Sequence, residues 1–117
     1  MDLKYLLTSF EGRINRAKFW AGVGILIVIG IVATIIDLVL GLQISSDGTG
    51  IVSIIAALVS IYLSLALYAK RWHDRDKSGW WTLIVLVPIV GQIWFLVELG
   101  ILQGSTGSNR YGPDPLA

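Results

Sequence analysis

The chain has 117 residues, of which 55% are hydrophobic and 15% are charged, and its formal net charge is +1. Soluble proteins average about 25% charged residues, so this composition favours a membrane protein, and the small net charge gives no basis for nucleic-acid binding. The absence of cysteine and the single histidine argue against a disulfide framework, a thiolate nucleophile and a histidine-rich metal site, and we expect no cofactor and no metal.

Residues 1–18 are predicted to form a cytoplasmic or interfacial segment. Their apolar side chains recur at the spacing of one helical face: Leu3, Leu6, Leu7 and Phe10. This pattern predicts a short N-terminal interfacial helix. Asn15 is a suitable N-cap for the element that follows.

Three uncharged apolar runs come next: Phe19 to Ile36, Ile51 to Ala69 and Trp80 to Val97. At a rise of ~1.5 Å per residue, each covers roughly 27 Å, close to the ~30 Å hydrocarbon thickness of a bilayer. The prediction is an all-α integral membrane protein, a single domain over 1–117 with transmembrane helices at 19–42, 51–69 and 80–102. Residues 70–79 form a connection, and residues 103–117 a turn-rich tail. Pro88 and Gly91 either kink the third helix or break it into a re-entrant hairpin.

Basic residues set the expected orientation. Four precede the first run, four lie between the second and third, and the first connection has none; the eight are Lys4, Arg13, Arg16, Lys18, Lys70, Arg71, Arg75 and Lys77. By the positive-inside rule, the N-terminus and the connection 70–79 are cytoplasmic in a multi-pass protein. A full third span puts the tail outside the membrane, whereas a re-entrant hairpin returns it to the cytoplasm.

Asp37 and Glu98 are the two carboxylates set in apolar surroundings. An intramembrane acid is a functional candidate by default. Each lies about 18 residues past the start of its run, however, which places it at the far interface. We expect both carboxylates to be solvated at the ends of their helices. The alternatives are that they form a cation or proton site together, or that they make structural hydrogen bonds.

Small residues recur along the second run at spacings of four, three and four: Ser53, Ala57, Ser60 and Ser64. Small side chains permit close approach of helices in lipid, so this stripe is predicted to be a helix-packing face. The alternative is the lining of a pore.

The segment between the second and third runs carries the densest set of polar groups. Its basic and tryptophan residues fit membrane anchoring. With the basic residues before the first run they form a candidate site for a lipid head group or a protein partner, comprising Arg13, Arg16, Arg71, His73, Asp74, Arg75 and Trp80. His73 beside Asp74 suggests general-base chemistry, but neighbours in sequence need not face each other and no nucleophile is positioned. We therefore predict no catalytic residues.

Several motifs in the same order resemble the domain-of-unknown-function family 805, small bacterial inner-membrane proteins. They are SFEGRINRAKFW at Ser9 to Trp20, RWHDRDKSGWW at Arg71 to Trp81, Pro88 with Gly91, and GSTGSNRYGPDP at Gly104 to Pro115. The resemblance implies location in the inner membrane, and it does not imply any particular activity. Family members often carry glycine or asparagine where this chain has Asp76, which weakens the expectation of a positive-φ turn there. A recognisable tail motif implies docking, and docking onto the basic connection requires a re-entrant third run.

The leading functional expectation is a non-enzymatic membrane protein that binds anionic lipid or a protein partner through a cytoplasmic arginine and tryptophan face. The alternative is an oligomeric transporter or channel subunit, because three short helices cannot enclose a path alone. A lipid-acting enzyme using His73 and Asp74 is third. The expected partners are membrane lipids and either further copies of the chain or another membrane protein, without nucleic acid.

Overall fold

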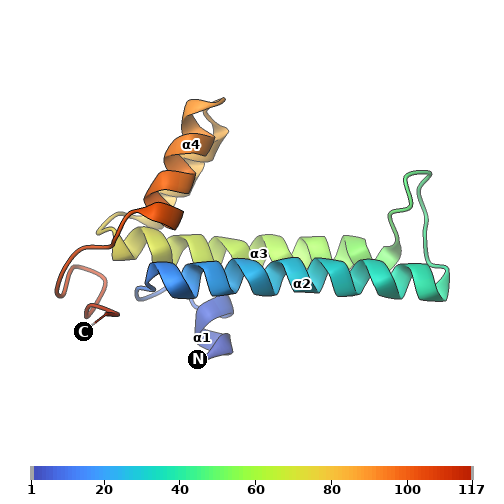
Figure 1. The fold of residues 1–117 in the computed structure, drawn as a ribbon, viewed down its shortest axis with the longest axis horizontal. Coiled ribbons are helices and arrows are strands. Elements are labelled where there is room, and N and C mark those ends of the chain that lie inside the picture. The colour runs from blue at the N-terminus through green and yellow to red at the C-terminus, as the bar shows by residue number, and fades with distance from the viewer. Residues whose placement is uncertain (1, 117) are drawn as a thin grey trace.

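The computed structural model describes residues 2–116, which form helices and no β-strand (Figure 1). The elements are α1 (Leu3–Thr8), α2 (Arg16–Leu40), α3 (Ile51–Asp74), the 3₁₀-helix η1 (Gly79–Leu86), α4 (Val90–Leu96) and the π-helical turn η2 (Val97–Ile101). Helices α2 and α3 lie side by side, and α1, the remaining helices and the C-terminal tail gather at one end of the pair (Figure 1). We call that end the head and define it as residues 2–18, 70–79 and 103–116.

Helices α2 and α3 are each long and apolar enough to cross a membrane, judged by length and composition. Asn15 caps α2 as predicted, because its side chain accepts a hydrogen bond from the Lys18 backbone N–H at 2.9 Å. The two helices pack closely near the head, where a Cβ at Gly22 would overlap the Leu67 side chain. Elsewhere the pair exposes a continuous apolar surface, which is typical of a membrane-facing surface.

Asp37 joins the far ends of the two helices. Its carboxylate accepts hydrogen bonds from the backbone N–H groups of Val52 at 3.0 Å and Ser53 at 2.8 Å, and the residue is 1% exposed. Gly50, the N-cap of α3, has no side chain to do this, so Asp37 of α2 caps α3 from outside. The expectation of a solvated helix end is therefore wrong for Asp37. A joint site with Glu98 is also wrong, because Glu98 pairs with Arg75 of the head, at the other end of the helix pair.

The third apolar run is a helical hairpin rather than one helix. Its first leg is η1 and its second leg is α4 with η2, and the two legs contact each other (Figure 1). Pro88 stands at the bend, Ile89 adopts a positive φ of 66°, and a Cβ at Gly91 would overlap the Ile84 carbonyl oxygen. Three spanning helices are thus not confirmed. The chain turns back because Pro88 has no N–H for a helical bond and Gly91 lets the legs approach.

The predicted small-residue stripe is only partly a packing face. Ser53, Ser60 and Ser64 are half-buried, but Ala57 is exposed. Ala56, one position earlier, lines a cleft between α2 and α3 together with Val32 and Ala33 of α2. The prediction is wrong for Ala57, because a helical face repeats at 3.6 residues and the interface follows a track that is rotated relative to the stripe.

The α3–η1 connection turns at Asp76, which has φ 58°. Aspartate tolerates the left-handed conformation better than most non-glycine residues, since its short polar side chain bonds locally. The positive-φ turn is therefore present, and the doubt raised by the lack of glycine at this position is removed. The turn directs η1 away from the axis of α3 (Figure 1).

Candidate functional site

A buried ion cluster organises the head. Arg13, which precedes α2, lies 3.0 Å from one oxygen of Asp74 at the end of α3, and both side chains are almost fully buried. Arg71, one turn earlier on α3, binds the other oxygen at 2.7 Å and is also inaccessible. The charge of Asp74 is thus compensated from two sides, as a buried carboxylate requires. This pairing explains why α3 continues to Asp74, past the apolar run that ends at Ala69.

The remaining donors of the two arginines bind backbone carbonyl groups. Arg13 donates to the carbonyl oxygens of Ser105 and Gly107, both at 2.6 Å. Arg71 donates to Leu99 O at 2.7 Å and to Leu102 O. Because these guanidinium groups are buried and already bonded, a phosphate outside the protein cannot reach Arg13 or Arg71 in this arrangement.

The C-terminal tail docks onto the same cluster. Ser105 N–H donates to Asp74 O at 2.7 Å, and the Asn109 amide donates to His73 O at 2.9 Å. Tyr111 stacks on His73 with 3.9 Å between ring centroids and 3° between planes. The NRYGPDP motif therefore anchors the tail to the basic connection, at the same end of the molecule as the N-terminal segment. Local bonds support it, since backbone N–H groups of Leu116 and Gly107 lower the pKa of Asp114.

Glu98 belongs to a second ion cluster, which ties the hairpin to the head. Arg75 lies 2.7 Å from one of its oxygens and Lys77 lies 2.5 Å from the other. On the opposite side, Arg16 donates to Ile101 O at 2.8 Å and Trp20 donates to Gly100 O at 2.9 Å. The hairpin is consequently fixed at its base, while its tip has no such polar attachment among the described residues.

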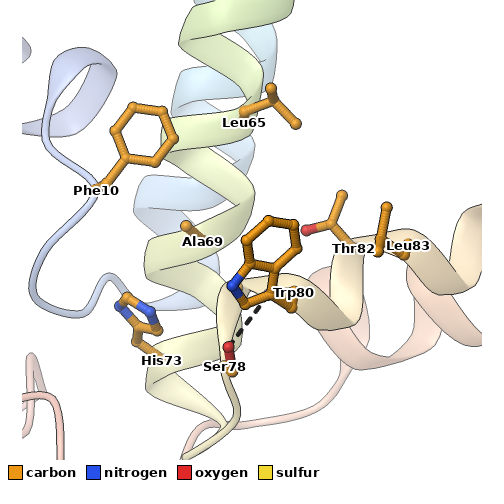
Figure 2. A pocket seen from close by; sticks show the side chains of 9 residues that line it. Phe10, Leu65, Ala69, His73, Ser78, Trp80, Thr82 and Leu83 are labelled. Atoms are coloured by element: carbon orange, nitrogen blue, oxygen red, sulfur yellow. Dashed lines mark hydrogen bonds between the residues drawn. The ribbon is translucent and has the colours of Figure 1, made fainter.

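A cavity of about 510 Å³ lies beside the ion cluster, between the segment after α1, the last turns of α3 and the start of η1 (Figure 2). Its wall is mainly apolar, with three polar side chains; the lining residues are Phe10, Leu65, Ala69, His73, Ser78, Gly79, Trp80, Thr82 and Leu83. Gly79 brings η1 close to α3, since a Cβ there would crowd Ala69. Cavities of this size and lining are typical of sites for small apolar or amphipathic molecules.

The structure separates the predicted site residues into three groups. Arg13, Arg71 and Asp74 lie in the buried ion cluster, whereas His73 and Trp80 line the cavity. Arg16 is exposed on α2, and Arg75 is half-buried against Glu98. His73 and Asp74 do not act on one another: the Asp74 oxygens bind arginines, and His73 Nδ1 lies 2.9 Å from Gly12 O. The predicted surface is therefore divided between the buried ion cluster, the cavity wall and two arginines, Arg16 and Arg75, that bind the hairpin.

Sequence reasoning missed most of the cavity wall. Phe10, Leu65, Thr82 and Leu83 come from three separate segments and carry no common spacing. The one usable signal was the pair of small residues Ala69 and Gly79, which flank the basic connection. Small residues at that place allow two helices to approach, and close approach at one point leaves a space beside it.

Comparison with known proteins gives the chain a family. It is similar to the Escherichia coli inner membrane proteins YhaI, with 37% identity over 92% of this chain and 86% of the relative, and YhaH, with 35% identity over 92% and 87%. The uncharacterized Escherichia coli protein YiiR is 27% identical over 97% of this chain and 90% of its own length. No solved structure matches. Because the model of the family described as "Protein of unknown function (DUF805)" matches residues 7–113, the chain belongs to that family.

Proposed function

We propose that the chain is a multi-pass bacterial inner-membrane protein that holds a phospholipid at its cytoplasmic end. Two observations support the inner-membrane location. Relatives that match more than nine-tenths of the chain are named inner membrane proteins, and α2 and α3 have the length and composition of membrane-spanning helices. In this arrangement α2 and α3 cross the bilayer, and the head lies at one membrane surface.

The distribution of charge supports a cytoplasmic head. The four basic residues before the first apolar run and the four between the second and third runs belong to the head, whereas the loop between α2 and α3 has none. The tail is bonded to Arg13 and His73, so it lies on the same side as the N-terminus. This proposal replaces the expectation of an external tail, which depended on a full third span.

The cavity between Phe10, His73 and Trp80 carries the proposal of lipid binding. Two of its apolar lining residues, Leu65 and Leu83, are 43% and 56% exposed, and they continue the apolar surfaces of α3 and of the hairpin. Two of its three polar residues, His73 and Ser78, come from the head. A phospholipid has the same division between an apolar chain and a polar head group. The proposed role is binding rather than catalysis, because the imidazole of His73 and the carboxylate of Asp74 have separate partners.

Lipid retention tests the proposal. The full chain is extracted in a mild detergent, and its bound lipids are measured by native mass spectrometry. Leu65→Trp should fill part of the cavity and reduce the retained phospholipid several-fold. Leu58→Trp is the matched control, since Leu58 is exposed on α3 but does not line the cavity. Absence of bound phospholipid from the wild type, or equal retention by the two variants, would refute lipid binding at this cavity.

The orientation of the chain in the membrane is tested separately. Because the sequence contains no cysteine, each introduced cysteine is the single site of labelling. Single cysteines replace Thr8, Ser46 and Ser108, all exposed positions outside α2 and α3. In intact cells an impermeant thiol reagent should label the variant at position 46 only. After the membrane is permeabilised, all three should react. Labelling of the Ser108 variant in intact cells would place the tail outside and reject the proposed topology.

A further inference from the structure

The orientation of His73 fixes the hydrogen-bonding character of one wall of the cavity. His73 Nδ1 lies 2.9 Å from Gly12 O, and a carbonyl oxygen can only accept a hydrogen bond. The hydrogen therefore sits on Nδ1, and in the neutral ring Nε2 is an acceptor. Stacking on Tyr111, with 3° between the ring planes, holds the imidazole in this orientation.

Nε2 is directed to the cavity side of the ring. The nitrogen would lie 4.0 Å from a Cβ placed on Gly79, a lining residue, and the side chain of His73 itself lines the cavity (Figure 2). Residues 2–116 supply no hydrogen bond to Nε2; the one bond of this side chain is made by Nδ1. The cavity therefore contains an acceptor with unused capacity, held by the rest of the head.

His73 and Ser78 lie in a different part of the cavity from Leu65 and Leu83, whereas Thr82 lies beside Leu83 on η1 (Figure 2). His73 lies in the last turn of α3, and Ser78 lies in the connection, where its hydroxyl accepts a bond from Trp80 N–H at 3.3 Å. Leu65 is two turns earlier on α3, and Leu83 lies on η1. A ligand that fills this cavity thus places an apolar chain between α3 and η1 and a polar group near the connection.

We propose that the cavity takes one acyl chain of a phospholipid whose head group donates a hydrogen bond to His73 Nε2. This inference rests on the proposed function and names the lipid class. An ethanolamine head group supplies N–H donors and a glycerol head group supplies O–H donors. A choline head group supplies neither, because its nitrogen is fully methylated, and an ionised phosphate only accepts. The site selects for a donor, in contrast to an arginine site, which selects for phosphate oxygens.

Competition between lipids with identical acyl chains tests the selection directly on the wild-type protein. The full chain in detergent receives equal amounts of phosphatidylethanolamine, phosphatidylglycerol and phosphatidylcholine, and native mass spectrometry measures the bound fraction of each. We expect at least one donor lipid to be retained about tenfold over phosphatidylcholine, the factor for one hydrogen bond that involves a charged group. Preferential retention of phosphatidylethanolamine would identify an ammonium donor, and preferential retention of phosphatidylglycerol would identify a hydroxyl donor. Equal retention of all three lipids overturns the inference.

His73→Phe separates the acceptor from head-group charge. Phenylalanine keeps a ring that can stack on Tyr111 but has no nitrogen, so retention of the donor lipid should fall about tenfold, to the level of phosphatidylcholine, and the preference should fall to about one. A preference that survives His73→Phe overturns the inference, because another group must then produce it. Failure of the proposed function has a different signature, namely no retained phospholipid or no effect of Leu65→Trp, whereas retained lipid without head-group preference refutes this inference alone.

Discussion

Replacing Arg13 with alanine should release the C-terminal tail. Arg13 is buried against Asp74, and it donates to Ser105 O and Gly107 O at 2.6 Å, so one side chain joins the N-terminal segment, α3 and the tail. Removing one member of a buried ion pair costs about 3–5 kcal/mol. Asp74 keeps Arg71 at 2.7 Å, and its charge is not left alone, so we expect the lower value, about 3 kcal/mol.

A loss of that size raises the population of the open tail about a hundredfold, since about 1.4 kcal/mol corresponds to a factor of ten. Limited trypsin cleavage after Arg110 reports this population when the tail opens and closes faster than it is cut. Arg110 is exposed, but its side chain donates to Asp76 O at 2.8 Å, which holds the site against the head. The measurement is the initial cleavage rate in detergent, resolved by mass spectrometry.

Arg16→Ala is the control for this experiment. Arg16 lies three residues along the chain and carries the same charge, but it is exposed and makes one hydrogen bond, to Ile101 O. We expect less than about a fivefold change in the cleavage rate, corresponding to roughly 1 kcal/mol. Equal rates for the two variants would show that Arg13 does not hold the tail and would contradict the ion cluster described above.

Three further results are expected. Gly91→Ala should lower the thermal unfolding temperature in detergent by several degrees, because the added Cβ meets the Ile84 carbonyl oxygen; an unchanged temperature would reject close contact between the hairpin legs. Ala56→Leu should destabilise the α2–α3 pair by about 1–3 kcal/mol and Ala57→Leu by much less. A larger destabilisation by Ala57→Leu would instead support the predicted packing face that includes Ala57. Carboxyl NMR should find the pKa of Asp114 below its ordinary value of 3.8, so its contribution to the folded tail is present above that pH and is lost as the pH falls through the lowered pKa; a midpoint at or above 3.8 would contradict this.

Local signals in the sequence predicted local structure well. The hydrophobic spacing around Leu6 indicated the helix now seen as α1, and the Asn15 cap is confirmed. Such features depend on residues within a few positions of each other. Pro88 and Gly91 likewise marked the break in the third run, but the choice between a kink and a hairpin depends on contacts that composition does not report.

Docking of the tail on the basic connection was implied by the family resemblance, and the bond from Asn109 to His73 O confirms it. Most other contacts between distant segments were not predictable from the sequence. Arg13 and Gly107 are 94 residues apart, and nothing in the local pattern of either distinguishes a buried arginine from a surface one. Positive charge near an apolar run fits topology, lipid binding and internal pairing equally well. The expectation for Asp37 was wrong for the same reason, since its role depends on the backbone N–H groups at the start of α3.

The contacts of Asp37 and Arg13 at the two ends of the helix pair restrict how the helices can move. Asp37 binds the first turn of α3 at one end, and Arg13 binds Asp74 at the other. Helices α2 and α3 therefore cannot slide along each other without breaking one of these contacts. The 25 residues of α2 span roughly 37 Å, which exceeds a hydrocarbon layer of ~30 Å. When the pair crosses a bilayer as proposed, it meets a change in thickness by tilting as a rigid body. The hairpin is fixed to the head through Glu98, so it tilts with the pair and the depth of its apolar tip at Ile89 in the membrane changes.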